Sequence, residues 1–540
     1  MSHPIGIDLG TTYSAIAKWV SKVQFTGSEA YHIPSENGYA LPSKVYIEPD
    51  DDDENVHNFV FGKTAISKGY LYPDQYITAV KREMDDATHR YSILGHEYSP
   101  IDISAQILNQ LLFIAEGVEA PGTYVPCGIV VSVPYYFKQH QNINTKEAAL
   151  IAIRQLYEGR KFNGDIEDLF LELIAEPIAA GLDYAFNRDA KDSTENILVF
   201  DLGGGTFDLT VFTLTQKNKS VQFKVLAVSG DDRLGGEDFD NSLFQWVCDY
   251  ENIDLLSLDE KSKRRSFKEI QPKITDVKHV LTQLKKTDLS IANAIGSRHI
   301  EIDMIKRTDF EDCINGKNGS KVDYIGTIEY LLEKVLDSAS ISSSDINCVL
   351  AVGGSSQIPM IKKILSDTFG PSKIKDARDI NLAVSRGAAI YAAYLLDERL
   401  EKNNQPRQYL NKWDNIEIGM VTPHQLGIKK KGTFYKILED NHITPHKAKR
   451  FFSPTMLSDD AQFAILDKIE VLQGSKNDYS IVGEIELENI YTHGRNLDDI
   501  DIEITFEAKN SSMIHVSVLI NKGNKDQSDF HRETELKLCE

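Results

Sequence analysis

The stretch IGIDLGTTYS, residues 5–14, decides the fold because its pattern recurs later in the chain. Residues 198–212, LVFDLGGGTFDLTVF, repeat the same order of an apolar strand, an aspartate, a leucine, a glycine turn and a second strand. The distance between the two copies is far too long for a solenoid repeat. The repetition predicts two related lobes that face each other across a cleft, each contributing one glycine turn.

Strand patterns alternate with helix patterns over the first 400 residues. Apolar runs at 128–134 and 346–354 also end in turn-forming residues, and Ala- and Leu-rich stretches follow several of the strands. Residues 381–400 predict a buried helix that closes this part of the chain. Such alternation is typical of α/β lobes.

The composition changes after this helix. Residues 401–415 are polar and contain Pro406, which indicates a linker. From residue 416 to residue 540, short alternating runs are separated by turn signals, and no long helical pattern appears, which predicts an all-β module. The expected boundaries are 1–400 for the α/β part, 401–419 for the linker and 420–540 for the β module.

Charge and cysteine usage exclude several classes of partner and site. The 540 residues include 59 Lys and Arg and 81 Asp and Glu, a net charge of −22, which disfavours binding of the whole surface to nucleic acid or to an anionic membrane. No secretory signal and no bilayer-spanning apolar run occur. The five cysteines are scattered and form no CxxC pair, so neither a disulfide framework nor a zinc site is indicated. We expect a cytoplasmic protein with neither nucleic acid nor membrane as a partner.

The glycine turns are suited to phosphate, because a residue without Cβ lets backbone N–H groups approach an anion closely. Asp8 and Asp201 directly precede the first two turns. An aspartate beside a phosphate is repulsive unless a divalent cation lies between them, so the pairing predicts Mg²⁺. One such turn alone is more often a tight hairpin with a solvated aspartate. A third turn at 352–359, before a helical stretch, favours a nucleotide.

The motifs together resemble the 70-kDa heat-shock chaperones of the DnaK type, within the actin and sugar-kinase superfamily. The matching motifs of the α/β part are IGIDLGTTYS (5–14), AVKR (79–82), SVPYYF (132–137), AEPIAAGLDYA (175–185), VFDLGGGTFDLTV (199–211), SGDDRLGGEDFDN (229–241) and AVGGSSQIP (351–359). The β module is similar to the substrate-binding half of these chaperones from residue 421 to residue 518. The resemblance implies a two-lobed actin-like ATPase domain, a duplicated ribonuclease H-like α/β fold, followed by an all-β sandwich domain.

The resemblance also assigns roles to individual residues. It places Asp8 and Asp201 around Mg²⁺ and Lys81 at the terminal phosphate. It places Glu176 near the attacking water, with Asp201 and Thr206 completing the catalytic set. The expected nucleotide-binding residues are Gly10, Thr11, Thr12, Tyr13, Gly203, Gly204 and Gly205 at the phosphates, Gly235, Gly236 and Glu237 near the ribose, and Lys278, Thr282, Gly353, Gly354 and Ser355 at the adenosine. Such a set suits phosphoryl transfer, which needs mainly positioning and charge neutralisation. Taken alone, Lys81 would be interpreted as a surface lysine and Glu176 as a carboxylate at the start of a helix, and only the whole set of motifs indicates a catalytic role.

Three positions of the expected base clasp depart from the family pattern. Thr275 stands where a glutamate is expected, and His279 and Gln357 stand where arginines are expected. Loss of guanidinium planes removes stacking and cation–π contact with the base, each worth about 1–2 kcal/mol when desolvated. We expect weaker nucleotide binding than in a typical member.

Further departures concern coupling between the parts. Pro134 is kept, but Asn142 replaces an expected arginine, and the linker strand at 416–419 contains Glu417 and Gly419. Burying an unpaired carboxylate is costly, so we expect weak docking of this strand on the lobes.

In the β module, Ile428, Phe452 and Ile469 fall either at the expected peptide pocket or in an ordinary sandwich core, and both alternatives are open. Asp467 falls near the pocket in an uncertain register, and it would move the preference away from purely apolar peptides. The sequence given ends shortly after the last β runs. We therefore expect no helical lid, weak trapping of peptide and fast release.

The implied activity is that of an ATP-hydrolysing, chaperone-like protein with ATP/ADP and Mg²⁺ as cofactors. The implied partners are an extended or unfolded polypeptide, a J-domain co-chaperone and a nucleotide-exchange factor. An alternative is a nucleotide-responsive scaffold or co-chaperone with a slow ATPase and one dedicated partner. A small-molecule kinase on the same superfold is disfavoured by the appended β module and by the motifs at 235–240 and 352–359.

Overall fold

A computed structural model provides the fold and covers most of the chain. It describes residues 2–22, 25–50, 52–53, 56–86, 88–119, 126–158, 160, 164–188, 192–254, 260–295, 298–317, 322–376, 380–422, 424–430, 433–441, 446–452, 463–464, 468–475, 478–486, 490–491, 501–508, 513–521 and 528–537.

Two lobes are each built on a six-stranded sheet, and five strands of each sheet follow one order. The first lobe orders these strands β11-β10-β1-β2-β3, with β4 paired to β2, and the second orders them β18-β17-β12-β13-β14, with β19 added beside β14. In both, the central strand, β1 or β12, is antiparallel to the strand that follows it and parallel to its other neighbour. The predicted duplication is therefore confirmed. The strands of the first sheet are β1 (Pro4–Asp8), β2 (Tyr13–Lys22), β3 (Phe25–Ala30), β4 (Leu41–Pro42), β10 (Gly128–Val133) and β11 (Phe170–Ala175). Those of the second are β12 (Ser193–Leu202), β13 (Phe207–Lys217), β14 (Ser220–Asp231), β17 (Cys348–Val352), β18 (Ile374–Asp376) and β19 (Asn415–Gly419).

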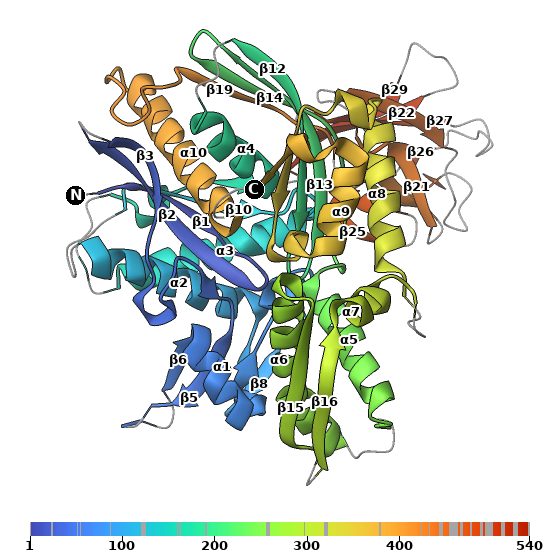
Figure 1. The fold of residues 1–540 in the computed structure, drawn as a ribbon. Coiled ribbons are helices and arrows are strands. Elements are labelled where there is room, and N and C mark those ends of the chain that lie inside the picture. Colours follow the sequence, from blue (N-terminus) through green and yellow to red (C-terminus); the bar gives the residue numbers. More distant parts are fainter. Residues whose placement is uncertain are drawn as a thin grey trace.

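Two helices fill the space between the sheets. Helix α10 (Ile380–Lys402) packs on β1, β2 and β10, and α4 (Glu176–Phe186) packs against α10. Small side chains such as Ala179 and Ala388 share one buried cluster with Phe212 and Phe223 of the second sheet. The predicted buried helix at 381–400 is thus confirmed, and it joins the lobes through a common core (Figure 1).

Helices cover the outer faces of both sheets, and each lobe carries an additional outer part. The first lobe adds β5 (Val45–Pro49), β6 (His57–Phe61), α1 (Gly62–Leu71), β7 (Tyr76–Ile77), β8 (Tyr91–Ile93), β9 (His96–Tyr98), α2 (Pro100–Glu119) and α3 (Gln139–Leu156). The second adds α5 (Gly236–Tyr250), α6 (Glu260–Gln283), β15 (Lys286–Ile295), β16 (Arg298–Lys306), α7 (Arg307–Ile314), α8 (Tyr324–Ala339) and α9 (Pro359–Phe369). In Figure 1 the outer parts around α1 and around α6 stand on opposite sides below the paired sheets.

The polar stretch after α10 is held tightly to the lobes. The carboxylate of Asp397 is fully buried and accepts hydrogen bonds from the backbone N–H groups of Gln408, Tyr409 and Leu410. The indole of Trp19 donates to the Tyr409 carbonyl at 3.0 Å. The expected linker therefore begins within the last residues of α10 and continues as an ordered coil.

Strand β19 extends the second sheet by pairing in parallel with β14. Ile416 is buried, whereas Glu417 is exposed and accepts a hydrogen bond from Gln222 at 3.0 Å. The expected burial of the Glu417 carboxylate is wrong, because strand alternation turns this side chain outward while Ile416 points inward.

The β module is a sandwich of two four-stranded antiparallel sheets. One sheet orders its strands β21-β20-β24-β25 and the other β22-β27-β28-β29. The strands are β20 (Gln425–Lys430), β21 (Thr433–Leu438), β22 (His446–Phe452), β24 (Lys468–Ser475), β25 (Asp478–Glu486), β27 (Asp501–Ala508), β28 (Met513–Asn521) and β29 (Ser528–Lys537), with β23 (Phe463–Ala464) and β26 (Ile490–Tyr491) forming a separate pair. Ile428 and Ile469 are buried between the sheets and Phe452 packs against them, which fits the alternative of an ordinary core. Asp467 lies outside the described residues.

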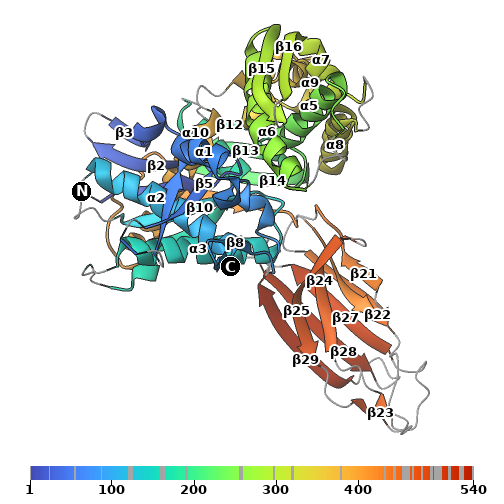
Figure 2. The ribbon, with the colours of Figure 1, turned by 90° about the horizontal axis from the view of Figure 1, so that it is seen from below.

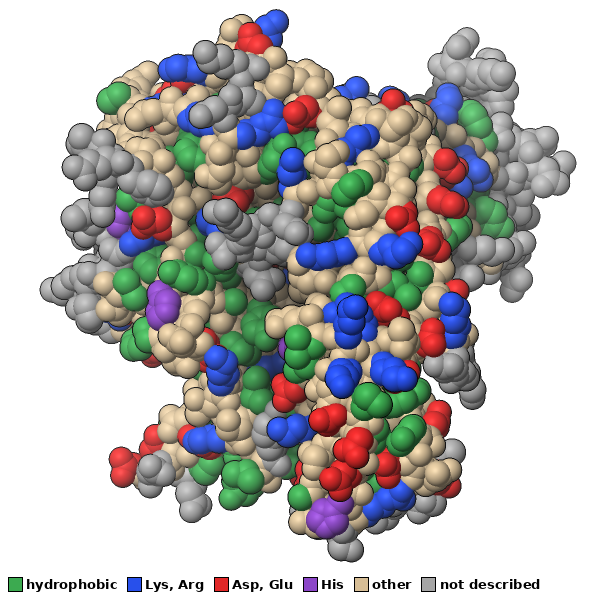
Figure 3. All heavy atoms as spheres, viewed as in Figure 1, with side chains coloured by type: hydrophobic (Ala, Val, Ile, Leu, Met, Phe, Trp, Pro, Cys, Tyr) green, Lys and Arg blue, Asp and Glu red, His purple; other side chains and the backbone are tan. Residues whose placement is uncertain are grey.

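The surface carries its charge unevenly. On the face shown in Figure 3, acidic side chains gather at the lower end of the second lobe, where Glu301 and Asp303 of β16 are exposed. Lysine and arginine side chains are mixed among acidic ones elsewhere on this face. Among the described residues, no helix combines the length and hydropathy needed to cross a bilayer.

Candidate functional site

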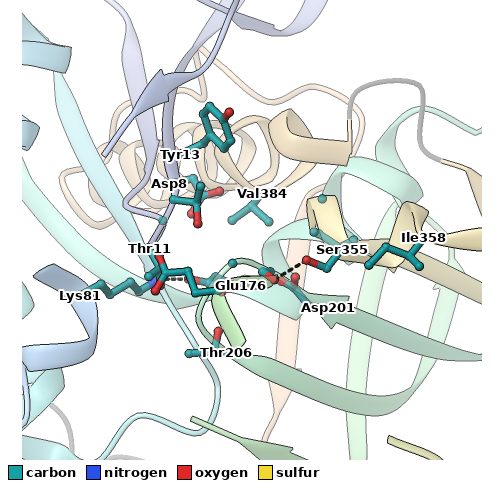
Figure 4. A pocket seen from close by; sticks show the side chains of 18 of the residues that line it. Asp8, Thr11, Tyr13, Lys81, Glu176, Asp201, Thr206, Ser355, Ile358 and Val384 are labelled. Carbon is teal, nitrogen blue, oxygen red and sulfur yellow. Dashed lines mark hydrogen bonds and ion pairs between the residues drawn. The ribbon is translucent and has the colours of Figure 1, made fainter. Parts of the chain in front are cut away.

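The glycine turns of the two lobes meet around one cavity. The cavity brings together most of the residues singled out in the sequence: Asp8, Gly10, Thr11, Thr12, Tyr13, Lys81, Glu176, Asp201, Gly203, Gly204, Thr206, Glu237, Lys278, Thr282, Gly353, Gly354 and Ser355. Gly205, Gly235 and Gly236 are not among its lining residues. Figure 4 shows Lys81 and Glu176 on one side and Ser355 and Ile358 on the other.

Strand direction explains why these residues converge. Asp8 ends β1, Asp201 lies one residue before the end of β12, and Val352 ends β17. Glu176 directly follows the end of β11. Because the carboxyl ends of parallel strands form one edge of a sheet, each lobe presents its polar residues at that edge, and the two edges face the cavity.

Close backbone approach requires glycine at two of these turns. A Cβ on Gly204 would lie 1.7 Å from Thr12 Oγ1, and one on Gly235 would lie 2.5 Å from the Gly204 carbonyl oxygen. Hydrogen bonds to the Gly203 carbonyl tie the turns together: the Gly236 N–H donates at 3.0 Å and the Ser355 hydroxyl at 2.9 Å. Gly205, Gly235 and Gly236 therefore pack against residues that line the cavity and do not line it themselves.

The first turn differs from the expectation in one respect. The Gly10 N–H donates to Ser14 Oγ at 3.2 Å, and the Gly10 carbonyl accepts from Ser43 Oγ at 2.7 Å. This N–H is engaged within the turn, so Gly10 shapes the loop and does not offer a phosphate donor in this conformation.

Lys81 and Glu176 form a buried ion pair at the base of the cavity. Lys81 lies in a 3₁₀ turn, Val80–Glu83, and its Nζ is 2.6 Å from Glu176 Oε1. Burial alone would lower the pKa of the Lys81 ammonium, but the carboxylates of Glu176 and Asp8 outweigh it and the pKa is raised. A permanent cation is thus held at this end of the cavity.

Three buried aspartates lie near this pair, and the charge of Glu176 acts on each of them. Burial and the charge of Glu176 raise the pKa of Asp8 to about 7, although Lys81 and the Ser132 hydroxyl oppose the rise. Burial, with Glu176 next in importance, also raises the pKa of Asp208 to about 7 and that of Asp201 well above its ordinary value. Asp208 was missed in the sequence, because a single aspartate on an alternating strand looks like an ordinary surface position. Its place seven residues after Asp201, just past the glycine turn, is the one available signal.

The residues fit Mg²⁺ bound together with a phosphate. Among the described residues, no three His, Cys, Asp or Glu side chains are arranged to hold a metal alone. Mg²⁺ commonly keeps several waters and takes only one or two carboxylates plus substrate phosphates. Asp8 and Asp201 approach from opposite lobes, and a cation would relieve the repulsion that raises their pKa values. Thr12 Oγ1 is buried and has no hydrogen-bond partner among the described residues, which leaves it available to a ligand.

The far end of the cavity contains Thr275 and His279, two of the three residues that depart from the family pattern, whereas Gln357 is not among the lining residues. Lys278 Nζ donates to the Gly236 carbonyl at 2.7 Å and lies 2.9 Å from Asp240 Oδ1. The Thr275 hydroxyl donates to the other Asp240 oxygen at 3.0 Å. His279 also lines the cavity, and burial lowers the pKa of its ring, which keeps the ring neutral at neutral pH. No guanidinium lines this end of the cavity in the described part of the chain.

Ion pairs across the mouth of the cavity connect the lobes. Arg82 of the first lobe donates to Asp238 Oδ2 at 2.9 Å and lies 3.6 Å from Glu237 Oε2 at the start of α5. Lys44 lies 3.8 Å from the other Glu237 oxygen. Sequence reasoning missed Lys44 and Arg82 as partners, because no local pattern reveals a contact between residues more than 150 positions apart.

Two duplicated sheets and a shared phosphate-suited cavity define a two-lobed, actin-like nucleotide-binding protein with an appended β sandwich. Comparison with known proteins narrows this class. The family model described as "Hsp70 protein" matches residues 71–537. The chaperone protein DnaK of Thermosipho melanesiensis is 30% identical over 538 residues, covering 97% of this chain and 79% of that protein. The DnaK of Elusimicrobium minutum is 28% identical over 545 residues, covering 98% of this chain and 77% of its own length. The chain therefore belongs to the Hsp70 family, as a distant, chaperone-like member.

Proposed function

We propose that the two lobes bind and hydrolyse Mg²⁺-ATP and that the nucleotide controls an attached β module that binds extended or unfolded polypeptide. Hsp70-family proteins are in general ATPases that bind unfolded polypeptides. The observation that carries the proposal for this chain is the buried Lys81–Glu176 pair, which lies in the same cavity as Asp8, Asp201 and the glycine turns.

The residues divide the chemistry between them. Lys81 places a cation where negative charge accumulates on the transferred phosphoryl group. Glu176, held by Lys81, orients a water and accepts its proton. Thr206 lines the cavity next to these groups and helps to position the phosphate. Bound Mg²⁺, held by Asp8 and Asp201, would neutralise phosphate charge.

The direct test is phosphate release from ATP by the purified chain and by the Lys81→Ala variant. We expect the variant to lose hydrolysis, and unchanged turnover would remove Lys81 from the mechanism. Lys373, which contacts carbonyl groups on the surface of the second lobe, provides a matched lysine-to-alanine control that should keep full turnover.

The alternative is a nucleotide-responsive scaffold or co-chaperone with a slow ATPase and one dedicated partner. Thr275, His279 and Gln357 favour it, because they weaken the expected grip on the base. Single-turnover ATP hydrolysis measured beside binding to an array of extended peptides separates the two functions. Broad binding of apolar peptides supports the chaperone, whereas slow hydrolysis without peptide binding supports the scaffold.

Partners and location follow from the same proposal. A J-domain co-chaperone and a nucleotide-exchange factor are the proposed regulators. A cytoplasmic location is proposed because Cys127, Cys248, Cys313 and Cys348 are free thiols, as a reducing compartment would keep them. A pull-down with and without ATP would identify the partners that respond to the nucleotide.

A further inference from the structure

One end of the β sandwich lies next to the lobes (Figure 2), and side-chain hydrogen bonds join the module to both lobes there. The Tyr135 hydroxyl of the first lobe donates to the Val421 carbonyl and accepts from the Val421 N–H, both at 3.1 Å. The Asn441 side chain makes a similar reciprocal pair with the backbone of Val228 in the second lobe, at 2.8 and 3.2 Å. These contacts join the module to a side chain of the first lobe and to the main chain of the second lobe.

A histidine is buried in the middle of this interface. His424 directly precedes β20 and is 6% exposed. Its Nε2 lies 2.8 Å from the Tyr136 carbonyl oxygen in the first lobe, and the two rings pack edge to face with centroids 4.5 Å apart. Because a carbonyl can only accept a hydrogen bond, Nε2 carries the proton in the neutral ring and Nδ1 carries none.

Charged groups from three directions surround His424. They share with it a cavity of about 280 Å³ at the junction of the two lobes and the β module. The first lobe contributes Lys138, the second Asp231, Asp232 and Lys334, and the β module Asp440. The neutral members of the lining are Tyr136, Gly230, Gln425 and Gly474.

A second proton on His424 is unfavourable in this setting. Burial disfavours the imidazolium and Lys138 repels it, while the Tyr136 and Phe137 carbonyls and the Asp440 carboxylate only partly compensate. The balance lowers the pKa of the docked ring from 6.5 to about 4. An undocked module would expose the ring to water and return it to its ordinary pKa.

We propose that His424 makes docking of the β module pH-responsive, so that protonation of its ring releases the module from the lobes. The undocked form binds the extra proton, so docking is strongest above the ordinary histidine pKa and weakens as the pH falls. For ring pKa values of 6.5 undocked and about 4 docked, the docking equilibrium constant falls about tenfold between pH 7.5 and pH 5.5. It falls by a further factor of about fifteen between pH 5.5 and pH 4, and it levels off below pH 4 because the docked ring then takes up a proton as well.

Native-state proteolysis of the full chain tests this inference without nucleotide turnover. When opening and closing are fast, the cleavage rate follows the population of the open form even if that population is small. Thermolysin cleavage within residues 415–424, identified by mass spectrometry, reports undocking, because β19 is paired with β14 in the docked structure and must leave the sheet before a protease can cleave it. The measured quantity is the ratio of cleavage rates of wild type and His424→Gln at each pH, which cancels the pH dependence of the protease.

The Gln variant keeps an Nε2–H donor for the Tyr136 carbonyl and cannot titrate. We expect the rate ratio of wild type to variant to rise about tenfold from pH 7.5 to pH 5.5. His299→Gln removes an exposed histidine on β16 and should cleave like wild type at both pH values. A ratio for His424→Gln that stays constant with pH would overturn the role of His424.

A second measurement covers the case in which His424→Gln is cleaved rapidly at both pH values. The titration of the His424 ring in the wild-type chain, followed by NMR and assigned by its loss in the variant, should give a pKa well below 6.5. A value at or above 6.5 would overturn the inference. ATPase activity, measured separately at pH 7.5, distinguishes this outcome from a failure of the proposed function.

Discussion

Replacing Lys81 by methionine should destabilise the lobes, because Glu176 loses its partner, and should abolish hydrolysis, because the cavity loses its cation. The Lys81 and Glu176 side chains are 6% and 9% exposed, with Nζ and Oε1 2.6 Å apart. At an effective dielectric constant of about 20, this separation corresponds to an attraction of about 6 kcal/mol, which offsets the cost of removing both charges from water. The variant keeps the buried carboxylate without its partner, so we expect the free energy of unfolding to fall by about 3–5 kcal/mol at pH 7.5.

The double variant Lys81→Met/Glu176→Gln separates stability from catalysis. Replacing both members of a buried pair by neutral groups is often neutral or stabilising, so most of the lost stability should return. Hydrolysis should stay lost by a factor on the order of 10²–10³ in both variants, because the cation that stabilises the transition state is absent. Urea unfolding of the nucleotide-free protein, with single-turnover ATP hydrolysis on the same samples, measures both quantities.

The pH dependence sharpens this comparison. The pKa values of Asp8, Asp201 and Asp208 are raised, so acid protonates these aspartates and relieves their repulsion with Glu176. The cost of Lys81→Met should therefore be smaller at pH 5.5 than at pH 7.5. The reasoning is refuted if the single variant loses less than about 1 kcal/mol at pH 7.5, or if the double variant is no more stable than the single one.

Three further outcomes follow from the geometry. Gly204→Ala places a Cβ 1.7 Å from Thr12 Oγ1 and should cost about 1–3 kcal/mol in urea unfolding, whereas Gly354→Ala meets nothing within 4 Å and should be neutral or stabilising; equal stabilities would contradict this. Asp8, an expected ligand of Mg²⁺, has a pKa of about 7 without a cation and holds a proton below that pH. Mg²⁺ together with ADP should therefore bind more tightly at pH 8 than at pH 6 and release protons, measured by calorimetry in two buffers; pH-independent affinity would argue against the site. Asn441→Ala removes two hydrogen bonds and should raise thermolysin cleavage at 415–424 on the order of tenfold, and an unchanged rate would show that this contact does not hold the module.

Local pattern was sufficient to predict much of the fold. The recurrence of an aspartate and a glycine turn after a strand predicted two lobes with matching sheets, because the same local sequence pattern forms the same local structure twice. The alternating runs beyond residue 415 predicted the sandwich, because alternation is typical of strands with one buried face. The turn residues gathered in one cavity because their strands end at the facing edges of the two sheets, whereas Lys81 reaches the cavity from a 3₁₀ turn.

Contacts between distant segments could not be predicted from pattern. Strand β19 was expected to dock poorly, yet alternation lets Ile416 face inward and Glu417 face outward. Tyr135 and Val421 meet across 286 positions, and nothing near either residue signals the other. His424 reads locally as a polar residue at the start of a strand, and its burial exists only because the lobes close over it.

The pairing of β19 with β14 also has a consequence for solubility. Strand β14 spans residues 220–231 and carries the apolar side chains of Val221, Phe223 and Val225. Without β19 its outer rim would present open N–H and C=O groups beside apolar side chains, a template on which other chains could assemble. The short β19 covers this edge of β14, and the exposed carboxylate of Glu417 disfavours pairing with another chain. Release of β19 from β14 would therefore favour self-association, and the paired strand prevents it.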